Sequence, residues 1–93
     1  MKGTGIILSD DDTVSRKFLD AAERAKGLEI KDNDIILNIY GLYKQATVGD
    51  NFTDMPGMFD LKGRAKWNAW MSKHGMTQED ARLRYIDAIS LLP

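Results

Sequence analysis

The fold is decided by one stretch of the sequence, residues 33–48, which reads NDIILNIYGLYKQATV. The stretch is rich in apolar residues, shows no strand-like alternation and has turn-forming residues on both sides. It therefore predicts a helix that begins at Asn33 or Asp34 and ends at Thr47 or Val48. Its apolar side chains cover far more than the stripe, roughly 100° wide, that an ordinary surface helix buries. They are Ile35, Ile36, Leu37, Ile39, Tyr40, Leu42 and Tyr43.

Two interpretations of this broad apolar surface are open. In the first, the helix is the centre of a bundle and is packed on several sides. In the second, one face packs in the core and another lines a ligand groove. Tyr40, Tyr43 and Lys44 favour the second, because their spacing places two phenols and an ammonium close together on one face. A tyrosine suits a partly wet pocket wall, and a lysine is a compact charge that suits a phosphate.

Three more helices are expected around this one. Upstream, residues 14–28 carry one apolar stripe at spacings of three and four, made of Phe18, Ala22, Ala25 and Leu28. Downstream, residues 49–62 form a loop, and a helix over residues 62–74 follows, with Gly75 as its C-cap candidate. Thr77 is the N-cap candidate of a fourth helix. The apolar face of that helix comprises Ala81, Tyr85, Ala88, Ile89 and Leu92.

The expected fold is therefore all-α, a small four-helix bundle. The length of 93 residues is that of one domain. We expect residues 1–12 to form a flexible leader, since Gly3 and Gly5 weaken regular structure, and residues 13–93 to form the domain. The triple aspartate at residues 10–12 lacks the ligand pattern of a calcium-binding loop. It is better placed near the N-terminus of the first helix, where the helix dipole favours negative charge.

Composition excludes several classes of function. The chain has no cysteine and one histidine, His74, so neither a disulfide framework nor a multi-histidine metal site is expected. The formal net charge of −1 argues against a general nucleic-acid binder. No stretch approaches the roughly 20 apolar residues that span a bilayer. We expect a cytoplasmic protein with no metal and no stable membrane insertion.

Charge is concentrated on the third expected helix. Residues 62–74 carry four cations and no acidic residue, and Trp67 and Trp70 lie among them. The simplest explanation is a solvated charged face with the tryptophans as core anchors. Concentration of one sign on a short element instead suggests an anionic partner. Stacked nucleic-acid bases are one such partner, but the overall charge favours the other, a small phosphorylated ligand.

Two long motifs now make the sequence recognisable. Residues 40–50 read YGLYKQATVGD and resemble the signature Y-x-x-Y-K-Q-A-T-x-G-D of the acyl-CoA-binding proteins. Residues 62–70 read KGRAKWNAW and are similar to that family's K-G-K-A-K-W-x-A-W. Shorter matches lie around Phe18, at residues 56–58 and around Tyr85, so the resemblance covers about residues 16–92.

The resemblance implies a four-helix bundle that binds one medium- to long-chain fatty acyl-CoA ester. By position, Lys44 would meet the ribose 3′-phosphate, Tyr40 and Tyr43 would flank the adenine and phosphates, and Lys66 and Tyr85 would reach the head group. Lys26 also matches a ligand contact, as does Ala22 near the acyl chain. Ile36 and Leu37 would border the acyl path. Asn38 replaces a commonly apolar residue, which predicts an altered preference for acyl-chain length.

The function expected from these residues is non-enzymatic binding, buffering and intracellular transport of long-chain acyl-CoA by a monomer. No catalytic residue and no cofactor are expected, and acyl-CoA is the bound ligand. A thioesterase-like enzyme is the first alternative, but no plausible nucleophile and base can be paired. A protein-interaction module gated by the ligand is the second.

Overall fold

The computed structural model describes residues 10–93, and this part of the chain contains helices and no strand. The helices are α1 (Asp10–Lys26), α2 (Asn33–Thr47), α3 (Leu61–Met71) and α4 (Gln78–Ser90). The expected all-α, four-helix architecture is confirmed.

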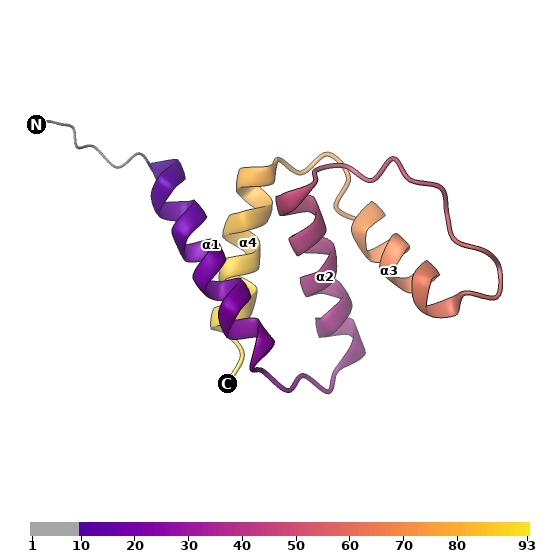
Figure 1. The fold of residues 1–93 in the computed structure, drawn as a ribbon, viewed down its shortest axis with the longest axis horizontal. Coiled ribbons are helices and arrows are strands. Elements are labelled where there is room, and N and C mark those ends of the chain that lie inside the picture. Colours follow the sequence, from indigo (N-terminus) through magenta and orange to yellow (C-terminus); the bar gives the residue numbers. More distant parts are fainter. Residues whose placement is uncertain (1–9) are drawn as a thin grey trace, which may run out of the picture.

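The helices are arranged around α4 and α2 (Figure 1). α4 packs against both α1 and α2, and α3 packs against the other side of α2. In the described part of the chain, the backbones of α1 and α2 do not approach each other closely.

The core lies where α1, α2 and α4 meet. Its buried apolar residues are Phe18, Ala21, Ile39, Leu42, Ala46, Ala81, Tyr85 and Ile89. The remaining members of the two expected stripes on α1 and α4 are half-buried and pack against this cluster. The periodic patterns therefore predicted the correct faces of both helices.

α2 and α4 begin where the sequence predicts, and a capping residue precedes each of them. Asp32 is the N-cap of α2, and its carboxylate accepts hydrogen bonds from the N–H groups of Asp34 and Ile35. The Thr77 hydroxyl accepts from the N–H of Asp80 at 3.0 Å and so caps α4.

The expected ends of α1 and α3 were partly wrong. α1 begins at Asp10 rather than at residue 14, so residues 10–12, which were expected to belong to the leader, are helical. Residues 1–9 of that leader lie outside the described part. α3 ends at Met71, not at His74, because the N–H groups of Lys73 and His74 bond to carbonyls only three residues back. Gly75 does not cap α3 but occupies a left-handed turn beyond it, at φ +89°.

The two tryptophans fasten the α2–α3 loop. Trp70 is buried and donates its indole N–H to the Gly49 carbonyl at 2.7 Å. Trp67 donates to the carbonyl of Thr53 at 3.0 Å. The long connection is thus tied to α3 at two points and has a defined shape.

None of the described helices is both long and apolar enough to cross a bilayer.

Candidate ligand-binding site

Two adjoining hollows lie on either side of α2. The α2–α3 pocket, of about 390 Å³, is lined by Asn33, Ile36, Leu37, Tyr40, Lys62, Ala65 and Lys66. The α1–α4 pocket, of about 380 Å³, is lined by Ala22, Ala25, Lys26, Ile36, Ile39, Tyr40, Tyr43 and Tyr85. Ile36 and Tyr40 line both, so the two hollows adjoin along α2, and we refer to them together as the groove.

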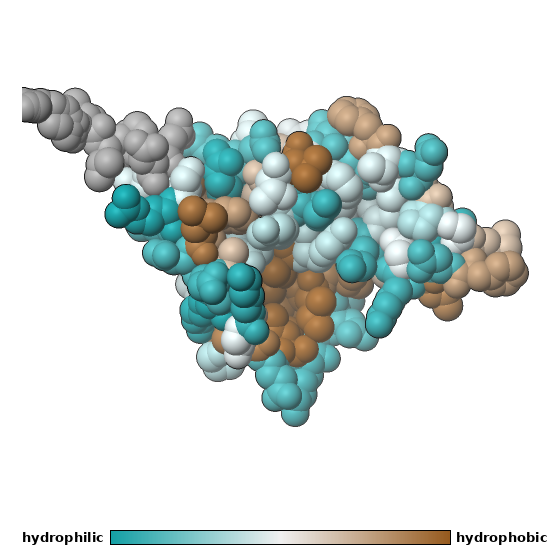
Figure 2. Space-filling view, viewed as in Figure 1, coloured by the Kyte–Doolittle hydropathy of each residue, from teal (hydrophilic) through white to brown (hydrophobic). Residues whose placement is uncertain are grey.

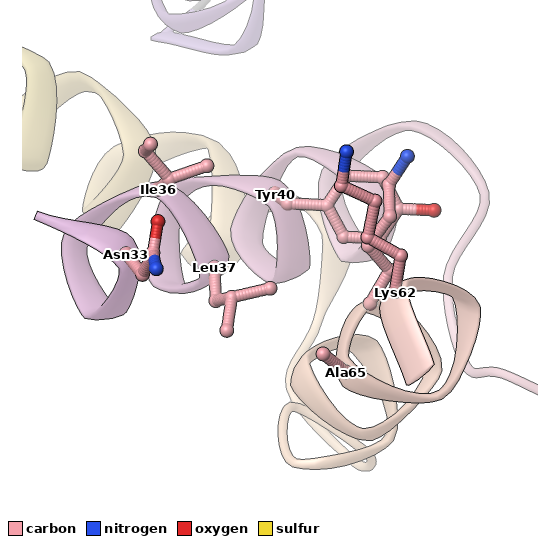
Figure 3. Close-up of a pocket in the computed structure, with 7 residues that line it drawn as sticks. Asn33, Ile36, Leu37, Tyr40, Lys62 and Ala65 are labelled. Carbon is pink, nitrogen blue, oxygen red and sulfur yellow. The ribbon is translucent and has the colours of Figure 1, made fainter. Parts of the chain in front are cut away.

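An apolar floor characterises the α2–α3 pocket. Ile36 and Leu37 of α2 and Ala65 of α3 line it. Figure 3 shows Leu37 pointing from α2 toward the helix that carries Ala65, and Tyr40 beside Lys62. Ile36 is 41% exposed although it is fully apolar. Hydrophobic surface also gathers over this half of α2 in the space-filling view (Figure 2). An exposed isoleucine in a hollow is costly to hydrate, and covering it with an alkyl chain removes that cost.

Cations lie at the Tyr40 end of the same pocket. The ammonium of Lys66 lies 5.0 Å from the centre of the Tyr40 ring, which is within cation–π range. Lys62 lines the pocket one helical turn before Lys66. The pocket therefore offers apolar contact along its floor and two positive charges beside an aromatic face, as an anionic amphiphile requires.

The α1–α4 pocket is built on a cluster of three aromatic rings. Tyr43 stacks on Phe18 at 5.7 Å between ring centres, and Tyr85 lies 5.0 Å from Phe18 and 5.8 Å from Tyr43. Burial, and then the nearby Tyr43, raise the pKa of the Tyr85 phenol above its ordinary value. Tyr85 therefore stays neutral near pH 7 and can act there as a hydrogen-bond donor.

A cation also stands at the edge of this second pocket. The ammonium of Lys26 lies 3.2 Å from the Glu23 carboxylate, and both side chains are about three-quarters exposed. Such an exposed pair contributes little free energy. Lys26 can therefore exchange this partner for a ligand anion at small cost.

The structure brings together eight of the nine residues that the sequence indicates. The exception is Lys44, which lines neither pocket. Its ammonium lies over the Trp70 ring, 4.7 Å from the ring centre, because α3 offers that aromatic face to it. The expected cluster of Tyr40, Tyr43 and Lys44 is therefore only partly assembled: the two phenols share a pocket, and the ammonium lies elsewhere.

Sequence reasoning missed Lys62 as a site residue. Its charge is apparent, but nothing in the charge alone distinguishes it from the other cations of residues 62–74. The available signal is its spacing of four from Lys66, which places both on one face of α3. Asn33, at the first turn of α2, is a second lining residue that carries no comparable signal.

Comparisons with known proteins agree with this geometry. A family model described as Acyl CoA binding protein matches residues 15–89. The chain belongs to the acyl-CoA-binding protein family. It is 51% identical over 76 residues to "Acyl-CoA-binding protein homolog 1" of Caenorhabditis elegans, covering 81% of this chain and 88% of the relative. It is 49% identical over 74 residues to "Acyl-CoA-binding protein homolog" of Drosophila melanogaster, covering 78% and 86%.

Solved structures of this family share the fold. Acyl-CoA-Binding Protein 2 of Oryza sativa superposes with a TM-score of 0.82 at 44% identity, over 85% of this chain and 89% of that one. A Moniliophthora perniciosa structure reaches 0.75 at 37% identity, over 80% and 74%. The chain thus shares its fold with proteins that are named for binding acyl-CoA.

Proposed function

We propose that this protein binds a medium- to long-chain fatty acyl-CoA ester, and buffers and carries it without transforming it. One observation carries the proposal: the two adjoining pockets along α2 combine apolar side chains with tyrosine rings and lysine ammonium groups. An acyl-CoA ester has the same division, since its alkyl chain is apolar and coenzyme A carries a pyrophosphate and a 3′-phosphate. Membership of the acyl-CoA-binding protein family supports the same ligand.

In this proposal the alkyl chain lies along the apolar part of the groove. Ile36 and Leu37 border it from α2, and Ala22 borders it from α1. Each buried methylene contributes about 0.8 kcal/mol, so the chain supplies much of the affinity. Ala22 suits this position because its short side chain leaves room between α1 and α2.

The head group takes the cationic part. Lys66 and Lys62 meet the phosphates beside Tyr40, and Tyr43 flanks the adenine. Lys26 and Tyr85 contact the head group from α1 and α4. Lys44 meets the ribose 3′-phosphate, for which its ammonium must leave the Trp70 ring. That exchange gives up a cation–π contact between a half-buried lysine and a buried ring, which contributes about 0.5–2 kcal/mol.

The position of the one histidine supports a purely binding role. His74 lies 3.8 Å from the Asp50 carboxylate and beside the Phe52 ring, and it lines neither pocket. A thioesterase would need a base near the ester, and the groove offers only lysines and tyrosines. We further infer that the protein is cytoplasmic, since it has no cysteine and so does not depend on an oxidising compartment. We infer a monomer, because one chain supplies all the residues that line the groove.

Calorimetric titration tests the proposal. Palmitoyl-CoA is expected to bind one-to-one and far more tightly than palmitate or coenzyme A alone, because only the ester occupies both parts of the groove. A thiol-reactive dye in the same solution should detect no release of coenzyme A. Equal affinity for the ester and either component would contradict the binding proposal, and thiol release would contradict the non-enzymatic role.

A further inference from the structure

A third pocket adjoins the groove between α2 and the end of α3. It has a volume of about 440 Å³ and shares two of its lining residues, Leu37 and Ala65, with the α2–α3 pocket. We call it the Asn38 pocket, and its polar lining residues are Asn38, Asn68, Ser72 and Lys73. An alkyl chain that lies along Leu37 in the α2–α3 pocket therefore has a polar hollow beside its path.

Contacts with α2 hold the Lys73 side chain at the Asn38 pocket. Its ammonium donates a hydrogen bond to the Asn38 side-chain oxygen at 2.6 Å. Its alkyl stem passes close to Gly41, where a Cβ atom would lie 3.4 Å from the Lys73 Cε. The Lys73 backbone is fixed as well, because its N–H donates to the Trp70 carbonyl at 3.0 Å. The position of this cation is therefore set by the packing of α3 on α2.

The positive charge of Lys73 is not balanced by a negative charge within the pocket. The described residues that line the Asn38 pocket include no carboxylate, and Lys73 is in none of the ion pairs that the described residues form with one another. Lys73 is also half-buried. Burial, and then the nearby Arg84, lower the pKa of the Lys73 ammonium below its ordinary value of 10.5. Both causes disfavour the charged form, and an anion placed beside the ammonium would favour it again.

We propose that the Asn38 pocket binds a carboxylate at the far end of the acyl chain, so that the protein accepts ω-carboxy acyl-CoA esters. Lys73 pairs with this carboxylate, and Asn38 remains beside the pair as a neutral hydrogen-bonding group. A carboxylate adds the attraction of opposite charges to the hydrogen bond that the Asn38 amide accepts, so it is the better partner for the ammonium. This role of the pocket rests on the proposed function, because the chain reaches Lys73 only when its ester lies in the groove.

The methyl end of an ordinary acyl chain fits the Asn38 pocket less well. Alkyl groups that cover Asn38 and Lys73 displace water from them without replacing its hydrogen bonds, which costs free energy. In the apolar part of the groove the reverse holds, because a carboxylate beside Ile36 or Leu37 loses its hydration and gains no partner. The carboxylate is therefore favoured only where the chain is long enough to reach Lys73.

Paired titrations measure this dependence on chain length. Octanoyl-, lauroyl-, palmitoyl- and stearoyl-CoA are each compared by calorimetry with the ester of equal length that ends in a carboxylate. In the shortest pairs the carboxylate should weaken binding, and in the longest pairs the carboxylate ester should bind at least as tightly as the ordinary one. Weaker binding of the carboxylate ester by the same factor at every length would overturn the proposal. Tighter binding by the same factor at every length would overturn it too, since the carboxylate would then be bound by the cations of the groove.

Variants of Lys73 test its part in the binding of the carboxylate. Lys73→Met removes the charge and keeps most of the stem, so it should weaken the carboxylate ester of stearoyl length by about three- to tenfold and should not weaken stearoyl-CoA. Lys73→Arg keeps the charge and should keep most of the affinity for the carboxylate ester. The matched control is Lys31→Met, an equal change of charge at an exposed site outside all three pockets, which should change both affinities only slightly. Equal losses for the two esters in Lys73→Met, or the same change of their ratio in Lys31→Met, would contradict the proposal.

Chemical-shift mapping of the unaltered protein keeps the test decisive if a variant misfolds. Exchange of stearoyl-CoA for the carboxylate ester of the same length should move the side-chain amide signals of Asn38 and the backbone signal of Lys73. Shift differences confined to Tyr40 and Lys66 would overturn the proposal. Binding of the ordinary esters without any response of Lys73 to the carboxylate would refute this role of the Asn38 pocket and leave the proposed function intact. Failure of the ordinary esters themselves to bind would refute the proposed function, and the role of the pocket with it.

Discussion

Among single residues, Lys66 is the cation whose position is most closely tied to the groove. Its ammonium faces the Tyr40 ring from α3 and lines the α2–α3 pocket. Lys66→Gln should weaken binding of palmitoyl-CoA by about tenfold, since a hydrogen bond to a charged group contributes about 1.5–3 kcal/mol and part of this is screened at an exposed site. Titration at low and high salt measures the effect, and the loss should shrink as salt rises.

The control for Lys66 is Lys31→Gln, an equal change of charge at an exposed site outside the groove. It should change the affinity only slightly. A comparable loss in both variants would mean that the total charge of the protein, and not the position of Lys66, attracts the ligand.

Lys44 makes a more specific prediction, because the structure holds its ammonium over Trp70 and outside both pockets. If it meets the 3′-phosphate, Lys44→Ala should weaken ordinary palmitoyl-CoA considerably and barely affect the analogue that lacks this phosphate. Calorimetry with both ligands measures the difference. Equal losses would show that Lys44 acts through Trp70 or through α2 rather than on the phosphate.

At the scale of the helices, the backbones of α2 and α3 approach each other closely at Gly41. A Cβ atom at this position would overlap the Ala69 carbonyl oxygen. Gly41→Ala should therefore push α3 away and lower the free energy of unfolding by about 1–3 kcal/mol. Thermal unfolding followed by circular dichroism measures the loss as a lower Tm.

Gly57→Ala is the matched control for Gly41, because no atom lies within 4 Å of the Cβ position there. Its Tm should stay close to that of the unaltered protein. A Tm for Gly41→Ala that is equally unchanged would contradict the close approach of α2 and α3 on which the α2–α3 pocket depends.

Asp50, in the α2–α3 loop, links α2 to the turn before α4 through one carboxylate oxygen. It accepts from the Gly75 N–H and from the Gln45 amide, both at 2.8 Å, which ties the end of α2 to the turn before α4. These two hydrogen bonds, in that order, hold the pKa of Asp50 below its ordinary value of 3.8. The folded protein therefore binds this proton less readily than the unfolded chain, and the associated stability is lost as pH falls through the lowered pKa.

The pH dependence can be measured with Asp50→Asn. At neutral pH the variant should have the lower Tm, because the charged acceptor is gone. As pH is lowered from about 6 to about 3, the unaltered protein should lose stability faster, so the difference in Tm should narrow. A difference that is constant with pH would show that the carboxylate charge contributes nothing at this junction.

Sequence patterns predicted those helix features that depend on nearby residues. Asp32 and Thr77 are local caps, and both mark helix beginnings correctly. The end of α3 at Met71 and the position of Lys44 over Trp70 depend on contacts between elements distant in sequence. Neither spacing nor composition carries that information, which is why the predicted helix was too long and the contact between Lys44 and Trp70 was not predicted.

At the scale of the whole molecule, the groove exists because only α1, α2 and α4 contribute to the core among the described residues, which leaves part of α2 uncovered. α1 and α2 both pack on α4 and leave the face of α2 between them only partly covered. The excess apolar surface of residues 33–48 indicated that such a face exists. The packing of α1 and α3 determines that this face of α2 lines two pockets, which share Ile36 and Tyr40. The sequence pattern alone does not predict this.

The central claim is that one ligand occupies both pockets of this groove, with its chain on Ile36 and Leu37 and its head group beside Tyr40. Chemical-shift mapping of the isotope-labelled protein with coenzyme A alone and with palmitoyl-CoA tests it most directly. Coenzyme A should shift the signals of Tyr40, Lys62 and Lys66 and leave Leu37 unmoved, whereas the ester should shift all of them and Ile36 as well. Identical shift patterns for the two ligands, or shifts away from α2, would contradict the account.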